Sequence, residues 1–169
     1  MLFKTITRKS KIIPLSAGVV FGMCVMGCKA ETVEILNDVE PYSSMMNQAY
    51  ELVVDSYVVV WTESKKNEQY LTPGNIPRYR LPEPVSSSHI GEEIKKQKIV
   101  GVVKAGTSFE IVNIRHIKSF EYDYVHYDVE LLGRMRQPWG RLNAYRLMDQ
   151  YQAVPSIKKE FATRVDPPE

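Results

Sequence analysis

One segment near the middle of the chain, residues 124–131, alternates strictly between two kinds of side chain. The apolar or aromatic set is Val125, Tyr127, Val129 and Leu131, and the intervening set is Tyr124, His126, Asp128 and Glu130. A period of two is typical of a β-strand with one buried face. We therefore predict a strand here, with the first set in the core and the second set more exposed.

Further strand-forming segments lie on both sides of this one. Residues 52–54, 57–61 and 109–117 are rich in β-branched and aromatic side chains, which favours strands. Val102-Val103 leads into a turn at Lys104-Ala105-Gly106, residues 133–140 are expected to form a hairpin loop, and Leu142, Ala144 and Leu147 to lie on a final strand. Short strands joined by hairpins predict an all-β fold, either a small barrel or a compact β-sandwich.

Four segments are not expected to form strands. Ser43 or Ser44 could cap a short helical turn over Met45, Met46 and Ala49. Residues 65–89 contain Pro73, Pro77, Pro82 and Pro84 and predict a long loop, of the kind that is often functional. The charged stretch 92–98 indicates one helical turn or a simple turn, and residues 150–169 a poorly packed tail.

Residues 107–148 loosely resemble the later strands of bacterial SH3-like domains. The similar feature is Gly106-Thr107 followed by Phe109 and Ile111, which matches a Gly-Thr-x-hydrophobic-x-Ile strand that opens a meander. The resemblance implies an SH3-like barrel.

The first 27 residues form a distinct segment. Lys4, Arg8, Lys9 and Lys11 give it a basic start, and residues 12–27 carry no charge. A basic region followed by a short apolar region is typical of an export signal. A transmembrane helix needs about 20 apolar residues, so this run is short for one. An uncleaved membrane anchor remains the alternative.

The end of this segment, Val25-Met26-Gly27-Cys28, resembles the lipobox of bacterial lipoproteins. The resemblance implies that Cys28 receives a diacylglycerol and that a peptidase removes residues 1–27. Met26 departs from the family pattern, which has a smaller residue there. Because Lys29 rather than Asp follows the cysteine, the resemblance also implies the outer membrane, facing the periplasm, in a Gram-negative host.

The expected organisation follows from these segments. After the leader, residues 28–42 are acidic and mixed and predict a tether of about 20 Å, although a first strand through Val33, Ile35 and Leu36 is the alternative. Residues 43–149 are expected to form the β domain. Beyond the leader the chain holds 18 basic and 20 acidic residues, which gives no argument for a nucleic acid partner.

The sequence carries no recognisable catalytic or cofactor motif. Gly101 to Thr107 has P-loop glycine spacing, but a strand follows where the motif needs a helix, and Thr107 replaces its lysine. His116 and His126 lie near Asp123 and Asp128 on neighbouring predicted strands, but no spacing secures a third metal ligand. We therefore expect no metal, no cofactor and no catalytic residue that can be singled out.

One region has the composition of a contact surface. Residues 131–148 contain Trp139 and four arginines, and Tyr122 and Tyr124 precede them; we predict ligand contacts from Trp139, Arg134, Arg136, Arg141, Tyr122 and Tyr124. Trp and Arg are the residue types most enriched at binding hot spots. The alternative is a solvated hairpin with Trp139 packed against the barrel.

Together these features predict a lipid-anchored protein of the cell envelope. Its small β domain would bind a protein or cell-wall ligand such as peptidoglycan, and would not be an enzyme. An inhibitor or immunity-type lipoprotein that neutralises a toxin or hydrolase is one alternative, and a hydrolase without a recognisable motif is another.

Overall fold

The computed structural model describes residues 31–64, 67–133, 138–149 and 154–166. Cys28 and the leader, Arg134 and Arg136 lie outside the described residues. In the part that is described, no helix is long and apolar enough to cross a membrane.

The described chain is all-β, as predicted. Its strands are β1 (Thr32–Ile35), β2 (Ala49–Leu52), β3 (Ser56–Trp61), β4 (Gln69–Pro73), β5 (Glu93–Ile94), β6 (Gln97–Val103), β7 (Ser108–Lys118), β8 (Asp123–Leu131), β9 (Leu142–Asn143), β10 (Met148–Asp149), β11 (Ser156–Ile157) and β12 (Ala162–Val165). Three short 3₁₀ turns, η1 (Ser43–Met45), η2 (Ser87–His89) and η3 (Tyr145–Leu147), complete it.

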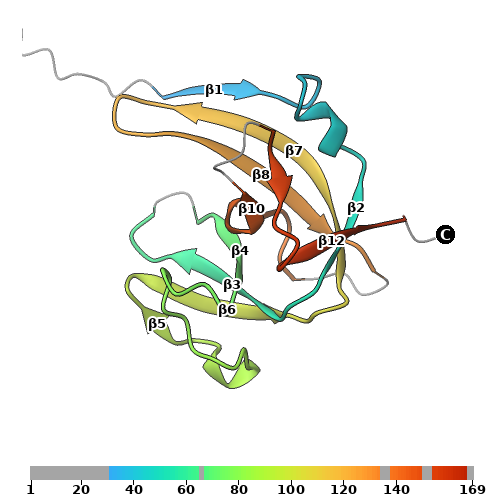
Figure 1. The fold of residues 1–169 in the computed structure, drawn as a ribbon. Helices are drawn as coiled ribbons and strands as arrows, with labels where there is room; N and C mark the ends of the chain where they lie inside the picture. The colour runs from blue at the N-terminus through green and yellow to red at the C-terminus, as the bar shows by residue number, and fades with distance from the viewer. Residues whose placement is uncertain (1–30, 65–66, 134–137, 150–153, 167–169) are drawn as a thin grey trace, which may run out of the picture.

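One large sheet dominates the fold and curls into a half-barrel (Figure 1). Its strand order is β12-β2-β7-β8-β9-β4-β3-β6-β5, with β1 paired to β7 and with β10 and β11 in a separate pair. The two longest strands, β7 and β8, form an antiparallel hairpin, and β8 is the strand that the alternation predicted. Gly106 has a φ of +83°, which suits the tight turn predicted between β6 and β7.

The main core lies on the inner side of this curl. Phe109, Ile111, Ile114 and Val129 are at most 1% exposed there. They pack with Leu71 of β4, Leu142 of β9 and Leu147 of η3. A smaller cluster of Tyr57, Val59, Leu81 and Ile99 forms beside it. Both halves of the sheet therefore contribute to burial.

The structure corrects the expectations for the two ends of the domain. Residues 32–35 form β1 against β7, which matches the alternative of a first strand and not the tether, and Leu36 after them is buried. The C-terminal tail also contributes a strand, because β12 pairs with β2 and Phe161 and Ala162 are buried in the main core. Both segments are only four residues long and contain β-branched residues, and backbone pairing with the edges of β7 and β2 fixes them as strands.

Two internal segments also differ from expectation. The predicted loop 65–89 contains β4, which pairs with β3 and places Leu71 in the core. The charged stretch 92–98 is a hairpin in which Lys95 and Lys96 both have positive φ. A two-residue hairpin turn of type I′ needs positive φ at both positions. The turn therefore holds both lysines in a backbone conformation that lysine seldom adopts.

The alternation in β8 correctly predicts which side chains face the core, but two of the side chains that it predicts to be exposed are buried. Tyr127 and Val129 are buried as predicted, and Val125 and Leu131 are half-buried against the core. His126 and Asp128 are also buried, at 2% and 8% exposure. Segments from elsewhere in the chain must therefore cover the polar face of β8.

Candidate functional site

The segments that cover the polar face of β8 leave part of it open to two hollows. Strand β9 is only two residues long, yet it joins the halves of the sheet: it pairs antiparallel with β8 at Asp128 and Val129 and parallel with β4 at Tyr70. Beyond this junction no described strand pairs with that edge of β8. The η3 turn follows one residue after β9. Its Tyr145 and Arg146 line one of two adjacent hollows, and Asn143 of β9 lines the other.

The larger hollow, the aromatic cleft, has a volume of about 450 Å³. Aromatic and basic side chains line it, together with an amide and an imidazole: Trp61, Tyr70, Tyr79, Tyr124, Tyr145, Arg78, Lys95, Arg146, Gln97 and His126. This size lies within the range of small-ligand sites. The described walls contain three cationic side chains and no carboxylate.

Arg146 is the buried cation of this cleft. It is 5% exposed, and its guanidinium carbon lies 3.8 Å from the ring centroid of Tyr79 and 5.2 Å from that of Tyr70. One guanidinium nitrogen donates a 2.7 Å hydrogen bond to Thr72 Oγ1. Within the described part of the chain, no carboxylate lies in ion-pair distance of Arg146.

Burial has an electrostatic cost for this arginine. Loss of hydration lowers the pKa of Arg146 to about 10, the nearby Tyr79 and Tyr70 oppose that change, and Arg78 adds to it. The guanidinium is still charged at neutral pH. Since a buried charge is normally paired, the cleft holds a cation that an incoming anion would stabilise.

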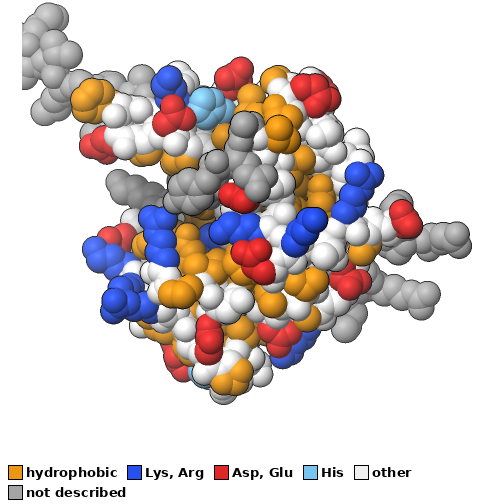
Figure 2. Space-filling view, in the orientation of Figure 1, with side chains coloured by type: hydrophobic (Ala, Val, Ile, Leu, Met, Phe, Trp, Pro, Cys, Tyr) orange, Lys and Arg blue, Asp and Glu red, His pale blue; other side chains and the backbone are white. Residues whose placement is uncertain are grey.

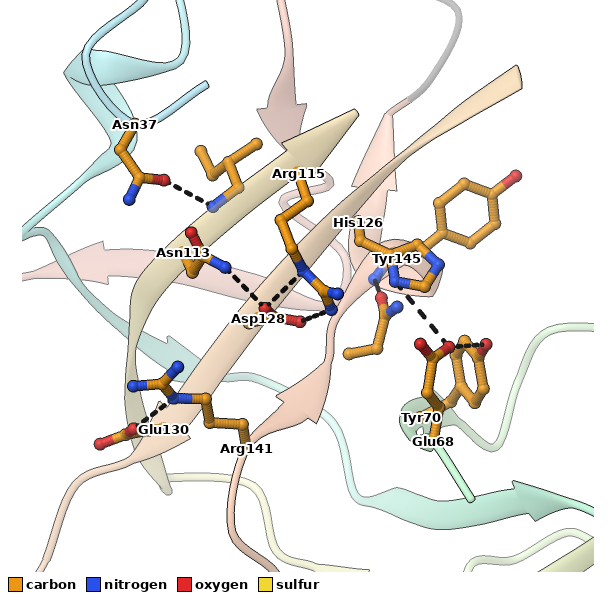
Figure 3. Close-up of polar contacts among 12 residues, drawn as sticks. Asn37, Glu68, Tyr70, Asn113, Arg115, His126, Asp128, Glu130, Arg141 and Tyr145 are labelled. Carbon is orange, nitrogen blue, oxygen red and sulfur yellow. Dashed lines mark hydrogen bonds and ion pairs between the residues drawn. The ribbon is translucent and has the colours of Figure 1, made fainter. Parts of the chain in front are cut away.

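The smaller hollow, the polar pocket, has a volume of about 330 Å³ and adjoins the aromatic cleft through nearby positions of β4 and β8. Asp128 lies in its wall and is fixed by three donated hydrogen bonds (Figure 3): two from Arg115 at 2.9 and 2.8 Å and one from Asn113 at 3.1 Å. The bond to Asp128 raises the pKa of Arg115. The charge of this carboxylate is therefore already balanced by Arg115.

Two other atoms of the polar pocket have no such partner. Asn143 Nδ2 and Gln69 Oε1 are buried and make no hydrogen bond, and both residues belong to the wall of the pocket. A donor and an acceptor left open in this way can bind hydroxyl or amide groups, from solvent or from a ligand. The pocket thus offers neutral polar contacts next to the cationic cleft.

Glu68, Tyr70 and His126 lie where the two hollows meet (Figure 3). Tyr70 Oη donates a 2.8 Å hydrogen bond to Glu68 Oε2, and His126 Nδ1 lies 3.9 Å from the same oxygen. Burial, followed by this bond to Glu68, raises the pKa of Tyr70. The tyrosine is therefore a neutral hydrogen-bond donor at physiological pH, and it holds the carboxylate at the rim.

The residues predicted to form one contact surface lie in separate places. The rings of Tyr122, Tyr124 and His126 follow each other along β8, with centroid distances of 5.3 and 4.7 Å. The loop that carries Trp139 begins after Leu131, at the other end of β8. At the usual rise per residue, Leu131 is about 24 Å from Tyr124. Of the four members of the predicted set that the structure describes, only Tyr124 lines the aromatic cleft.

Trp139 and Arg141 have structural contacts of their own. Trp139 is half-buried against the main core, and its ring lies so close to Gly101 of β6 that a Cβ there would be 2.1 Å from it. Arg141 is exposed and donates a 2.9 Å hydrogen bond to Glu130 (Figure 3), and it also borders the polar pocket. Trp139 therefore matches the alternative in which it packs against the barrel.

The histidines considered as metal ligands do not come together. His116 contacts Asp123 at 2.5 Å near the tip of the β7–β8 hairpin, whereas His126 is buried beside the cleft. Among the described residues, no group of three or more His, Cys, Asp or Glu side chains could hold a metal ion.

On the face drawn in Figure 2, basic side chains lie around the middle of the molecule, next to hydrophobic ones. Comparison with known proteins finds no matching family model, no matching curated protein and no matching solved structure. Only the chemistry of the site therefore indicates what this protein binds.

The sequence reasoning missed most of this site. Thr72 and Arg146 are 74 positions apart, and the aromatic residues come from β3, β4, the following loop, β8 and η3. No local pattern connects them. One signal was present: Arg146 stands within an otherwise mostly apolar stretch, Leu142 to Met148, where a charged residue needs an explanation.

Proposed function

We propose that this protein is a lipid-anchored binding module of the cell envelope, and that its aromatic cleft binds ligands through a carboxylate. The observation that carries the proposal is Arg146, a buried cation with no carboxylate partner among the described residues, in a cleft walled by aromatic rings. A guanidinium binds a carboxylate through two parallel hydrogen bonds, which gives both affinity and orientation.

The surroundings of Arg146 favour a ligand with apolar or planar atoms next to its carboxylate. Trp61, Tyr70 and Tyr79 offer ring faces around the guanidinium. Such rings supply apolar contact area at little cost in conformational entropy. Lys95 and Arg78 add positive charge to the walls, which would favour the approach of an anion.

The adjoining polar pocket supports an extended ligand over a single small ion. Its open donor on Asn143 and open acceptor on Gln69 suit amide or hydroxyl groups. A peptide ending in a free carboxylate has this combination of groups. Such an end occurs both in the peptide part of a cell wall and at the C-terminus of an envelope protein, so the test includes both sources.

The anchor is the second half of the proposal. It depends on Cys28 in the lipobox-like Val25-Met26-Gly27-Cys28. Two or more acyl chains would give stable attachment to a membrane. Acyl labelling of the full chain should be lost in Cys28→Ala and kept in Cys24→Ala, and labelling that survives Cys28→Ala contradicts the anchor.

Binding can be tested by calorimetry on the full chain in detergent. The probes are short peptides with a free C-terminal carboxylate, the same peptides as C-terminal amides, and soluble peptidoglycan stem fragments. We expect the free acids to bind and the amides to bind at least about 10-fold more weakly, since a charged hydrogen bond contributes about 1.5–3 kcal/mol. Preference for the stem fragments would identify the cell wall as the source.

Two arginine variants complete the test. Arg146→Met should remove binding of the free acids, and Arg146→Lys should recover it only in part, because an ammonium cannot form the paired contact. Arg164→Met is the matched control, since this exposed arginine lies on β12 and lines neither hollow. Equal binding of acids and amides, or unchanged binding by Arg146→Met, contradicts the proposal.

A further inference from the structure

The tip of the β7–β8 hairpin exposes an aromatic side chain that nothing in the binding site explains. Phe120 lies between the two strands and is 98% exposed, more than any other large hydrophobic side chain in the described chain. The backbone around it is well defined by hydrogen bonds: Ser119 N donates to Tyr122 O at 2.7 Å, and Ser119 Oγ accepts from the N–H groups of Glu121 and Tyr122. The turn therefore holds a fully solvated phenylalanine at a fixed place.

This tip lies next to the start of the described chain. Thr32 of β1 pairs with Lys118, the last residue of β7, and Tyr122 Oη donates a 2.6 Å hydrogen bond to Glu31 Oε2. In Figure 1 the tip and the beginning of β1 lie at the same corner of the molecule. The hairpin tip is therefore tied to the N-terminal end of the domain.

The distance from that corner to the lipidated cysteine is short. Only Lys29 and Ala30 separate Cys28 from Glu31. Three residues span at most about 11 Å, whatever their conformation. The strand β1 thus removes most of the tether that the sequence suggested, and an acyl chain on Cys28 would hold the tip close to the membrane surface.

We propose that the β7–β8 tip rests on the lipid bilayer and that Phe120 inserts into its interfacial region. This inference rests on the proposed anchor at Cys28. A phenylalanine in water is disfavoured, and transfer of its ring to the apolar boundary of a bilayer removes that exposure. Tyr122 beside it is 38% exposed, and such amphipathic rings favour the membrane–water interface.

The charges around the tip indicate that the contact is apolar. Glu31, Glu121 and Asp123 are acidic, and Lys118 is the basic residue among these exposed neighbours. Anionic headgroups would repel this set more than attract it. The bilayer contact should therefore form on neutral lipid and change little with salt.

Fluorescence quenching can locate the tip. The lipidated full chain with Phe120→Trp is reconstituted into phosphatidylcholine vesicles with or without bromine on the acyl chains, and the signal of the parent chain, with Trp61 and Trp139, is subtracted. Ile90→Trp is the matched control, because Ile90 is another exposed hydrophobic residue, 49% exposed, just after η2, which lies on the far side of the molecule from the tip (Figure 1).

We expect brominated lipid to quench the added emission of Phe120→Trp at least about two-fold and to leave that of Ile90→Trp nearly unchanged. Flotation with the vesicles reports the anchor separately. If the chain floats but the two added tryptophans are quenched equally, the anchor stands and the tip contact is wrong. If the parent chain neither carries acyl label nor floats, the anchor is wrong and the tip contact falls with it.

Discussion

The neighbouring residues Leu147 and Arg146 of η3 are both buried, but in regions of opposite chemistry. Leu147 is fully buried among apolar side chains of the main core, whereas Arg146 is buried among aromatic rings on the side of the cleft. The same contrast divides β8, where Tyr127 and Val129 face the core and His126 and Asp128 face the two hollows. Burial in the core stabilises the fold, whereas burial around the cleft leaves polar groups available to a ligand.

The largest expected effect tests the core side. Leu147→Ala should lower the free energy of unfolding by about 2–5 kcal/mol, because it leaves a cavity among side chains that cannot collapse into it. Urea unfolding followed by circular dichroism measures this loss. A loss below about 1 kcal/mol would mean that η3 is not packed as a core element, and the comparison between its two sides would fail.

A second core contact involves the tryptophan that the sequence placed on a binding surface. Gly101→Ala should cost about 1–3 kcal/mol by overpacking, because the new Cβ meets the rigid indole ring of Trp139. In the Trp139→Ala background, the same glycine change should cost much less. If Gly101→Ala has the same cost in both backgrounds, Trp139 does not occupy that position and the surface interpretation regains support.

On the cleft side the sign of the effect reverses. Arg146→Met should raise the free energy of unfolding by about 1 kcal/mol, since replacing a buried charge by an apolar group of similar volume is often stabilising. Burial disfavours the charged arginine strongly enough to lower its pKa to about 10 despite the nearby tyrosine rings. Chemical unfolding without ligand measures the change.

The control for this variant keeps the charge. Arg146→Lys leaves a cation in the same surroundings and should give no gain in stability. If Arg146→Met instead destabilises the protein by several kcal/mol, the hydrogen bond to Thr72 and the ring contacts serve the fold. The cleft would then be part of the structural framework, and Arg146 would not be held for a ligand.

The same contrast explains what could be predicted from the sequence. The inner face of β8 was predictable because Tyr127 and Val129 are in one continuous strand, where alternation directly encodes which side is buried. The burial of His126 and Asp128 was not, because their cover comes from β4, β9 and η3, which are distant in sequence. A polar residue in an alternating strand is indistinguishable from a solvated one until its cover is known.

Of the short edge strands, β1 was predicted only as an alternative to a tether, and β12 was not predicted. β1 pairs with the long strand β7, and β12 pairs with the four-residue strand β2. Each mixes β-branched residues with a charged one, Glu34 in β1 and Arg164 in β12, over only four positions. Tertiary pairing decides such segments. The cleft combines both difficulties, since its walls come from separate short elements and meet only when the sheet has closed around β9.

The smallest effect concerns a carboxylate–cation pair at the surface, the exposed counterpart of Asp128 and Arg115. Asp55 accepts hydrogen bonds from Lys104 Nζ at 2.7 Å and from Ala105 N at 2.9 Å, and these bonds lower the pKa of its carboxyl. Because the folded pKa lies below the unfolded value, the ionised group stabilises the protein above the unfolded pKa. That stability is lost as the pH falls through the folded pKa, so Asp55→Asn should matter at pH 7 and hardly at pH 2. The expected loss at pH 7 is below about 1 kcal/mol, since solvent screens exposed pairs. Asp38→Asn is the exposed control.

A difference between Asp55→Asn and the parent protein that stays constant from pH 7 to pH 2 would attribute the effect to the neutral hydrogen bond alone. Charge would then contribute to this molecule only where it is buried, and the contrast between surface and cleft would be sharper than we propose.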